Sequence, residues 1–166
     1  MLEIVRILMD YEKDPAGVEE MPQFNWELKS DKRGVVQKAY QLQIAENRDF
    51  DTPVYDSGVT ESRESAHIRP LHVELKSAVK YGVRVRVWAG AGDVLHAALA
   101  ECEESAWCEG SFVTALLSSE EWKAPFVSAE SAPTCREESK GTLVRGSFSV
   151  GSGLKEAYAF TTALGL

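Results

Sequence analysis

The sequence predicts an all-β protein built as an antiparallel β-sandwich. Three stretches that alternate between apolar and polar residues carry this prediction, namely residues 24–28, 40–45 and 81–88. A period of two sends neighbouring side chains to opposite faces of a strand, so each stretch indicates a strand with one buried face. In the longest stretch one face holds Tyr81, Val83, Val85 and Val87, and the other holds Gly82, Arg84, Arg86 and Trp88.

A leucine and a tyrosine six positions apart lead into that longest strand. Leu75 and Tyr81 are separated by a short polar turn. This arrangement resembles the tyrosine corner of immunoglobulin-like and fibronectin type III-like sandwiches, in which the phenol hydroxyl bonds to backbone a few residues upstream. The resemblance implies a structural role for Tyr81 and a fibronectin type III-like sandwich over residues 1–117.

The earlier strands follow in chain order. Residues 3–9 are apolar on both faces, which suits a first strand, and Asp14-Pro15-Ala16-Gly17 predicts a turn. In residues 23–29 the aromatic residues face inward, so Trp26 is expected at the centre of the core. Short strands are predicted at 54–59, an edge, and at 65–70, where a proline stops the strand.

The segment after residue 88 departs from a minimal sandwich. A turn is predicted at 89–93, and its last residue, Asp93, is a good helix cap. Apolar residues between Leu95 and Cys102 recur at i, i+3, i+4 and i+7, so a short inserted helix is predicted at 94–104. The closing strand of the sandwich is expected at about 107–116.

The composition becomes polar after the sandwich. Residues 118–141 are rich in Ser, Glu, Pro and Thr and are interpreted as a linker. Two strands are predicted at 142–150 and 154–164, joined by Gly151-Ser152-Gly153 in a hairpin turn. Because two strands do not make a domain, residues 142–166 are interpreted as the truncated start of a second, jelly-roll-like β module. Their apolar residues are expected either to dock on the sandwich or to pair with another copy of the chain through their open strand edges.

Composition and charge exclude several classes of function. The 166 residues include 26 acidic and 18 basic ones, and the formal charge of −8 argues against nucleic acid as a partner. No apolar run approaches the roughly 18 residues of a membrane span, so no membrane contact is expected. Cys102, Cys108 and Cys135 lack metal-ligand spacing and are expected as free thiols. Together with the lack of a signal-peptide pattern, this favours a cytoplasmic location.

Several stretches taken together resemble the N-terminal region of bacterial alpha-L-rhamnosidases, a family of glycoside hydrolases. The matching stretches are PQFNWEL at 22–28, QKAYQLQIA at 37–45, VYDSGV at 54–59, YGVRVRVW at 81–88, FVTALL at 112–117, EWKAPFV at 121–127, LVRGSF at 143–148 and ALGL at 163–166. The resemblance implies a non-catalytic accessory module of an enzyme that hydrolyses terminal alpha-L-rhamnose from glycosides. The implied partners are the remaining domains of that enzyme.

The sequence offers no catalytic, cofactor-binding or metal-binding constellation. Glycoside hydrolysis needs two carboxyl groups that face each other across a sugar pocket. Adjacent acids such as Glu103 and Glu104 point apart on a strand or a helix, so they do not make such a pair. His67, His72 and His96 lie in separate segments with no second ligand at metal-binding spacing. We therefore expect no catalytic residue, no cofactor and no metal in this chain.

Aromatic side chains keep a binding function open. Exposed Trp and Tyr rings stack on sugars in carbohydrate-binding modules. Trp88 lies opposite the valines, on the face of Arg84 and Arg86, while Tyr55 and Trp107 are not clearly inward. These five residues are interpreted as a contact for a sugar or for another domain. The alternative function is a stand-alone module that binds a carbohydrate or a protein through them.

Overall fold

Strand β7 (Lys80–Ala91) is the central strand of the first of two units into which the chain divides, Met1–Ser119 and Glu120–Leu166. The computed structural model describes residues 1–92, 99–127 and 144–162. β7 pairs antiparallel with β4 (Val35–Glu46) on one side and with β9 (Cys108–Thr114) on the other. The strand expected from the alternation at 81–88 is therefore present and longer than predicted.

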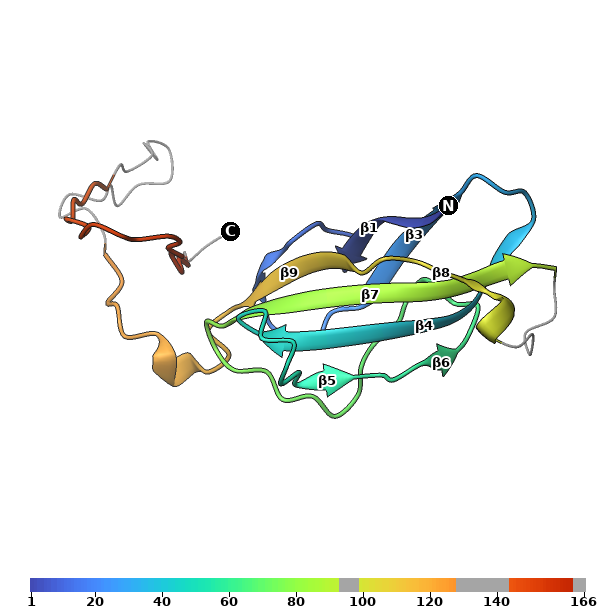
Figure 1. Cartoon of the computed structure of the whole chain (residues 1–166). Helices are drawn as coiled ribbons and strands as arrows, with labels where there is room; N and C mark the ends of the chain where they lie inside the picture. The colour runs from blue at the N-terminus through green and yellow to red at the C-terminus, as the bar shows by residue number, and fades with distance from the viewer. Residues whose placement is uncertain (93–98, 128–143, 163–166) are drawn as a thin grey trace, which may run out of the picture. The chain divides into compact units, whose positions relative to one another are not determined.

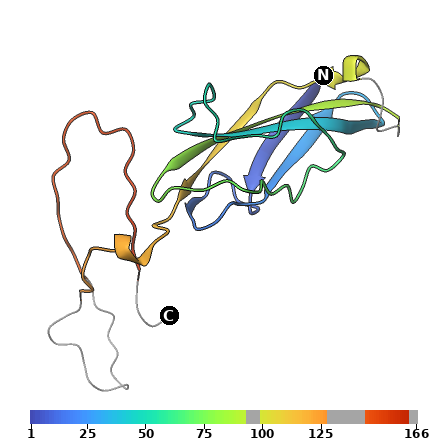
Figure 2. The same ribbon diagram turned by 90° about the horizontal axis from the view of Figure 1, so that it is seen from below.

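The first unit is a sandwich of two sheets (Figure 1). The larger sheet has the order β2-β9-β7-β4-β5, in which β2 (Ala16–Val18) and β5 (Tyr55–Asp56) are the edges. The short strands β6 (Thr60–Glu61) and β8 (Glu103–Glu104) add to β4 and β7. The smaller sheet pairs β1 (Leu2–Met9) antiparallel with β3 (Phe24–Ser30). Figure 2 gives the view of both sheets at right angles to Figure 1. The predicted all-β sandwich is confirmed.

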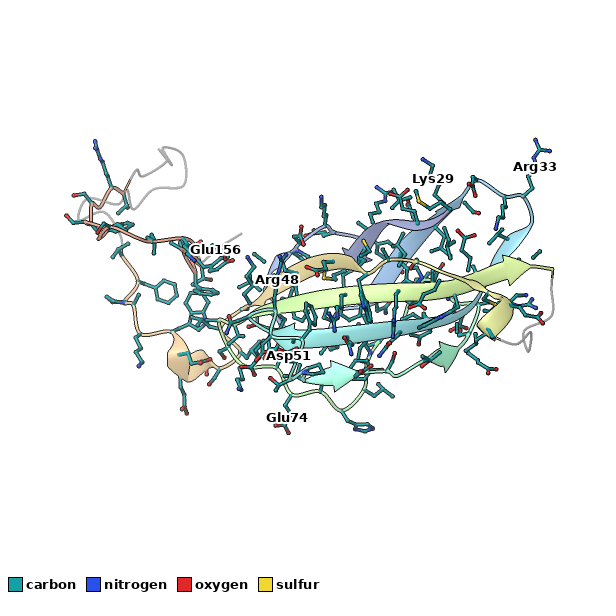
Figure 3. All side chains as sticks on the ribbon, in the orientation of Figure 1. Lys29, Arg33, Arg48, Asp51, Glu74 and Glu156 are labelled. Atoms are coloured by element: carbon teal, nitrogen blue, oxygen red, sulfur yellow. The ribbon has the colours of Figure 1, made fainter. Side chains whose placement is uncertain are left out.

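The core lies between the two sheets. Val83, Val85 and Val87 of β7 are fully buried and face apolar residues of β1 and β3. Charged side chains such as Lys29, Arg33 and Glu74 are exposed to solvent (Figure 3). This division follows from the period of two, which gives each strand one apolar face to bury and one polar face for water.

Trp26 lies in the core, as the alternation of β3 predicts. Its side chain is only 4% exposed, and its ring centroid is 5.1 Å from that of Tyr40. The indole Nε1–H donates to Gln37 Oε1 at 2.8 Å, and the Gln37 amide nitrogen donates to the backbone carbonyls of Ser62 and Glu64. The tryptophan therefore fills the core and, through Gln37, fixes the crossover that follows β6.

Tyr81 forms the tyrosine corner that its spacing from Leu75 predicts. The phenol is fully buried and stacks on Phe112, with the ring centroids 5.2 Å apart. Its hydroxyl oxygen accepts a hydrogen bond from the Lys76 backbone N–H at 2.9 Å. Thr114 Oγ1 donates to the Lys76 carbonyl at 2.6 Å, so both backbone groups of that residue are held. The corner ties the crossover to β7 and β9.

The strand predicted at 65–70 is not formed. The segment touches β3 at two points, where Ser65 O accepts a backbone hydrogen bond and Ile68 makes an isolated bridge. Between them His67 has a φ of 58°, and its backbone N–H donates to Asn25 Oδ1 at 2.9 Å. An amide that bonds to a side chain is lost from the ladder, so the pairing is interrupted there.

The helix predicted at 94–104 is wrong where the structure describes it, while residues 93–98 lie outside the described residues. Leu99–Glu101 forms a single 3-10 turn, and β8 follows and pairs with β7. Ser105 extends this contact, because its N–H donates to Val87 O at 2.9 Å and its hydroxyl accepts from Val87 N–H at 3.0 Å. Ladder bonds to β7 satisfy the backbone groups that a helix would otherwise pair internally.

Two predicted turns contain strand residues. β7 continues to Ala91, opposite Val35, so the turn predicted from residue 89 begins later. The turn predicted at 14–17 includes the start of β2 (Ala16–Val18), which runs parallel to the end of β9. A three-residue strand is too short to show a hydrophobic period, so no pattern predicts it.

The second unit contains no strand among residues 144–162, so the strands predicted at 142–150 and 154–164 are wrong for the part that the structure describes. Large apolar side chains are exposed there, above all Phe148 at 90%. A β pattern becomes a strand only where its backbone finds a partner, and two strands alone are marginal in water. Of the linker predicted at 118–141, Ser119–Glu121 is a 3-10 turn. The assignment of residues 142–166 to a second module stays a prediction.

Candidate functional site: the outer face of the larger sheet

The outer face of β4 and β7 gathers polar and aromatic side chains. The antiparallel register places Gln43 opposite Arg84 and Gln41 opposite Arg86. These side chains alternate with the buried valines and leucines of the same strands, so all four point away from the core. Trp107 precedes β9, whose first residue pairs with β7 between the two arginines. The register alone therefore brings two arginines, two glutamines and one tryptophan together.

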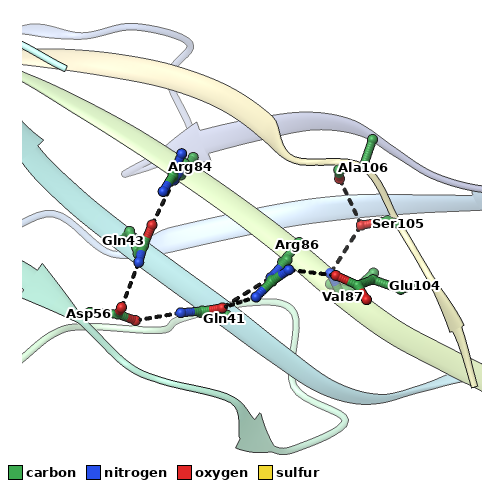
Figure 4. Close-up of polar contacts among 9 residues, drawn as sticks. All are labelled: Gln41, Gln43, Asp56, Arg84, Arg86, Val87, Glu104, Ser105 and Ala106. Atoms are coloured by element: carbon green, nitrogen blue, oxygen red, sulfur yellow. Dashed lines mark hydrogen bonds and ion pairs between the residues drawn. The ribbon is translucent and has the colours of Figure 1, made fainter. Parts of the chain in front are cut away.

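A continuous chain of hydrogen bonds links these side chains (Figure 4). Arg84 Nε donates to Gln43 Oε1 at 2.6 Å, and Gln43 Nε2 donates to Asp56 Oδ2 at 2.5 Å. Gln41 Nε2 donates to the other Asp56 oxygen at 2.8 Å. Arg86 donates to Gln41 Oε1 from Nε and Nη2, at 3.0 and 2.7 Å. Its Nη1 forms an ion pair with Glu104 at 2.6 Å, which closes the chain at β8.

Aromatic rings lie against both guanidinium groups. Arg84 Cζ is 4.4 Å from the ring centroid of Phe50 and 4.5 Å from that of Trp107. Arg86 Cζ is 4.6 Å from Trp107 and 4.9 Å from Trp88. These distances are within the range of cation–π attraction. We call the nine side chains the outer-face array: Phe50, Arg84, Trp107, Arg86, Trp88, Gln41, Gln43, Asp56 and Glu104.

A tight turn after β4 places Phe50 in the array. Asn47 and Arg48 adopt left-handed backbone with φ of 49° and 64°. The turn lies directly over Gly82, where an added Cβ would be 2.5 Å from Arg48 Cγ and 2.9 Å from Arg48 Cα. Only glycine leaves room for this approach. Arg48 also pairs with Glu109 of β9 at 4.0 Å, so the turn contacts both neighbouring strands.

The electrostatics of the array favour the ionised form of the Asp56 carboxylate. Partial burial alone would raise the pKa of Asp56, but hydrogen bonds from Gln41, Gln43 and the Gly58 backbone N–H, together with the charge of Arg84, lower it below its ordinary value. The Gln41 and Gln43 side chains are buried, yet the described residues contain no buried polar side-chain atom without a hydrogen bond. The buried polar atoms of the array are therefore all hydrogen-bonded.

The structure separates the five residues that the sequence grouped as a sugar or domain contact. Arg84, Arg86, Trp88 and Trp107 belong to the array, but Tyr55 packs against the core, opposite Ile44. Trp88 is only 8% exposed, so little of its ring is left for a ligand, whereas Trp107 is half-buried.

The sequence pattern does not predict the other members of the array. Gln41 and Gln43 alternate with Leu42 in a predicted strand, which placed them on an outer face but not beside arginines. Asp56 and Glu104 were assigned to an edge strand and to a helix. Phe50 lies in a turn region, where no pattern shows which way a side chain points.

Neither a cluster of metal ligands nor a helix able to span a membrane is found in the described part of the chain. There, no three His, Cys, Asp or Glu side chains gather in a way that could hold a metal ion. None of the helical turns in residues 1–92, 99–127 and 144–162 has the length or apolar character to cross a bilayer. Cys102 and Cys108 are free, and burial raises the pKa of the Cys108 thiol, which disfavours the reactive thiolate.

Comparison with known proteins gives consistent results. A family model described as the Rha78A-like, N-terminal immunoglobulin domain matches residues 4–117. An alpha-L-rhamnosidase of Formosa agariphila is 28% identical over 124 residues, a match that covers 68% of this chain and 13% of that protein. The crystal structure of Streptomyces avermitilis alpha-L-rhamnosidase complexed with L-rhamnose superposes with a TM-score of 0.67 and 26% identity over 79% of this chain.

The structure of alpha-L-rhamnosidase from Dictyoglumus thermophilum superposes with a TM-score of 0.61 and 25% identity over 73% of this chain. The matched region is 12% of the Streptomyces chain and 13% of the Dictyoglumus chain, so this chain corresponds to a small part of each relative. The family model spans most of the sandwich, including the tyrosine corner and the strands of the array. This chain therefore belongs to the family of Rha78A-like N-terminal immunoglobulin domains.

Proposed function

We propose that this accessory module serves an alpha-L-rhamnosidase-like glycoside hydrolase, and that it contributes structure and not catalytic acids. The parent activity would be hydrolysis of terminal alpha-L-rhamnose from glycosides. The support is that the module corresponds to only 12–13% of the length of proteins named as alpha-L-rhamnosidases. Its partners would then be the remaining domains of the same polypeptide.

The lowered pKa values of the carboxyl groups are the observation that best supports a structural role. A general acid in glycoside hydrolysis needs a raised pKa so that it holds a proton near neutral pH. The pKa values of the Asp31, Asp56 and Glu103 carboxyl groups are each lowered by hydrogen bonds and positive charge that outweigh burial. These groups stay ionised and serve as hydrogen-bond acceptors.

The stacking within the array favours a domain contact over a sugar platform. A ring that binds a sugar must offer an open face, and guanidinium groups already lie against Phe50, Trp88 and Trp107. Tyr55 is turned to the core. The stand-alone carbohydrate-binding alternative therefore has less support than a contact with another protein domain.

An assay of the purified chain on an aryl alpha-L-rhamnoside tests this proposal. We expect no turnover above the rate in buffer, and no saturable change in tryptophan fluorescence with L-rhamnose. The Asp56→Asn variant serves as the control, because Asp56 is the carboxylate at the centre of the array. Turnover that disappears in this variant would refute the accessory role, and a saturable rhamnose response that needs Trp107 would favour the carbohydrate-binding alternative.

We further propose that residues 142–166 mediate self-association when no other domain covers them. The supporting observation is the exposure of Val144, Phe148 and Leu154 in a segment whose described residues, 144–162, form no strand. Apolar side chains on backbone that lies outside a sheet can pair with a second copy. Light scattering should give a larger mass for the full chain than for a truncation ending at Leu117. Equal, monomeric masses at high concentration would refute this proposal.

A further inference from the structure

The two arginines of the outer-face array differ in how much of their hydrogen-bonding capacity is used. All three guanidinium nitrogens of Arg86 donate, two to Gln41 and one to Glu104. Arg84 donates only from Nε, to Gln43. Its two terminal nitrogens have no partner among the residues that the structure describes. Arg84 thus presents four unused N–H groups in the planar fork that matches a carboxylate.

The Arg84 guanidinium is held in place although its terminal nitrogens are unused. Phe50 and Trp107 both lie against it, and the bond to Gln43 fixes its orientation on the sheet. Asp56 is near enough to act on it electrostatically, but the Asp56 oxygens are occupied by Gln41, Gln43 and the Gly58 amide. An arginine ordered in advance loses less side-chain entropy when it binds a partner.

We propose that Arg84 is an anchor for a single carboxylate, supplied by an Asp or Glu side chain of a protein domain that docks on the outer-face array. The proposal rests on the accessory role and names the contact that this role requires. Phe50 and Trp107, both half-buried, would cover the pair and exclude water from it. Trp and Arg are the residues that most often dominate binding energy at protein interfaces.

Charge favours a protein carboxylate over an acidic polysaccharide. The chain has a formal charge of −8, which repels a polyanion at long range. The other arginines near the array are already paired, Arg86 with Glu104 and Arg48 with Glu109. Among the described arginines of the array, Arg84 is therefore the one with terminal N–H groups left for a carboxylate. The relatives extend far beyond the matched module, so their remaining length supplies protein surface for such a contact.

A titration followed by NMR tests the anchor directly. The probes are N-acetyl-glutamate methylamide, its neutral isostere N-acetyl-glutamine methylamide, and sodium glucuronate, each added at low salt to the full chain. The readouts are the Trp107 indole N–H and the Arg84 Nε–H signals. We expect a saturable shift with the glutamate probe and none with the glutamine probe, because only the carboxylate accepts two charge-assisted hydrogen bonds from the fork.

Three variants make the result specific. Arg84→Gln should weaken the response to the glutamate probe at least about threefold, as expected for a half-exposed ion pair. Arg84→Lys should weaken it as well, because an ammonium keeps the charge and loses the fork. Arg33→Gln removes an equal charge from an exposed loop and should leave the midpoint unchanged. The Val83 and Val85 methyl signals report whether each variant is folded.

Two outcomes would overturn the anchor. One is the absence of a saturable shift when the glutamate probe is added to the folded wild-type chain. The other is a titration midpoint in Arg84→Gln that equals the midpoint in the wild type. Binding of glucuronate about tenfold or more tighter than the glutamate probe would overturn the choice of a protein partner in favour of an acidic sugar. Turnover of an aryl rhamnoside by the chain would refute the accessory role without affecting these shifts, so the two failures are distinguishable.

Discussion

The two faces of β7 are held in different ways. On the inner face Tyr81 and Val85 are fully buried in an apolar core. On the outer face Arg84 and Arg86 reach their partners through individual hydrogen bonds and ring contacts. Burial is non-directional and tolerates small shifts, whereas hydrogen bonds need both partners at the right distance. Changes to the inner face should therefore alter stability most, and changes to the outer face should mainly alter local order.

The largest effect is expected from Trp26→Ala on the inner side. The variant opens a large cavity and leaves buried Gln37 without the indole donor, so the free energy of unfolding should fall by about 3–5 kcal/mol. Chemical denaturation of both proteins gives the value. The matched control is Trp122→Ala, because Trp122 is 39% exposed, and it should change stability by less than about 0.5 kcal/mol. Similar losses in both variants would mean that the core is not centred on Trp26.

Tyr81→Phe removes one oxygen from the inner face. The Lys76 backbone N–H would lose its acceptor, so we expect a loss of about 1–3 kcal/mol. Tyr11→Phe is the control, since Tyr11 is exposed and its hydroxyl makes only a long contact, 3.4 Å, with His67. The two variants are compared by their midpoints of denaturant unfolding, provided that the slopes of the transitions are equal. A loss within experimental error for Tyr81→Phe would show that the corner contributes nothing to stability.

Gly82→Ala acts on the outer face, where the added methyl group would meet the backbone of Arg48. The turn that carries Phe50 must shift, which we expect to lower stability by about 1–2 kcal/mol and to move Phe50 away from Arg84. Gly146→Ala is the control, because a Cβ there meets nothing within 4 Å. The ring-current shift of the Arg84 Nε–H reports the displacement. An unchanged shift in a destabilised variant would show that Phe50 is not placed by the turn over Gly82.

The inner face could be predicted from the sequence, whereas the outer face could be predicted only as a group of residues and not as pairs, for a physical reason. The period of two in β3, β4 and β7 is local, so it revealed Trp26 in the core and Tyr81 at the corner. The pairs Gln43 with Arg84 and Gln41 with Arg86 depend on register between segments about forty residues apart, which alternation does not fix.

The errors in the prediction share one cause, which is competition between local pattern and available partners. The helix predicted at 94–104 includes Glu103 and Glu104, yet β7 offers these two residues a ladder, and β8 forms instead. Residues 144–162 have a β pattern and find no strand partner among the residues described. A local pattern states what a segment prefers, while a strand also requires a neighbour.

The smallest effect concerns pH. Because the folded-state pKa of Asp56 is lowered, its contribution to stability is complete above the ordinary carboxyl pKa of about 4 and is lost as the pH falls below it. Asp56→Asn should therefore remove part of the acid dependence of stability, by less than about 1 kcal/mol because the group is exposed to solvent. Urea melts between pH 2.5 and 7 would reveal it. If the free energy of unfolding falls equally at acidic pH in the wild type and in Asp56→Asn, the pKa of Asp56 is not lowered by folding.

We expect the outer face of β7 to carry an ordered array in the isolated chain. The Arg84 and Arg86 Nε–H signals in NMR spectra of the wild type and of Trp107→Leu measure this order. We predict two resolved, slowly exchanging signals in the wild type, displaced by the indole ring current, and a change of both signals in the variant because both guanidinium groups lie against that ring. Averaged arginine signals that do not respond to the loss of Trp107 would contradict the account.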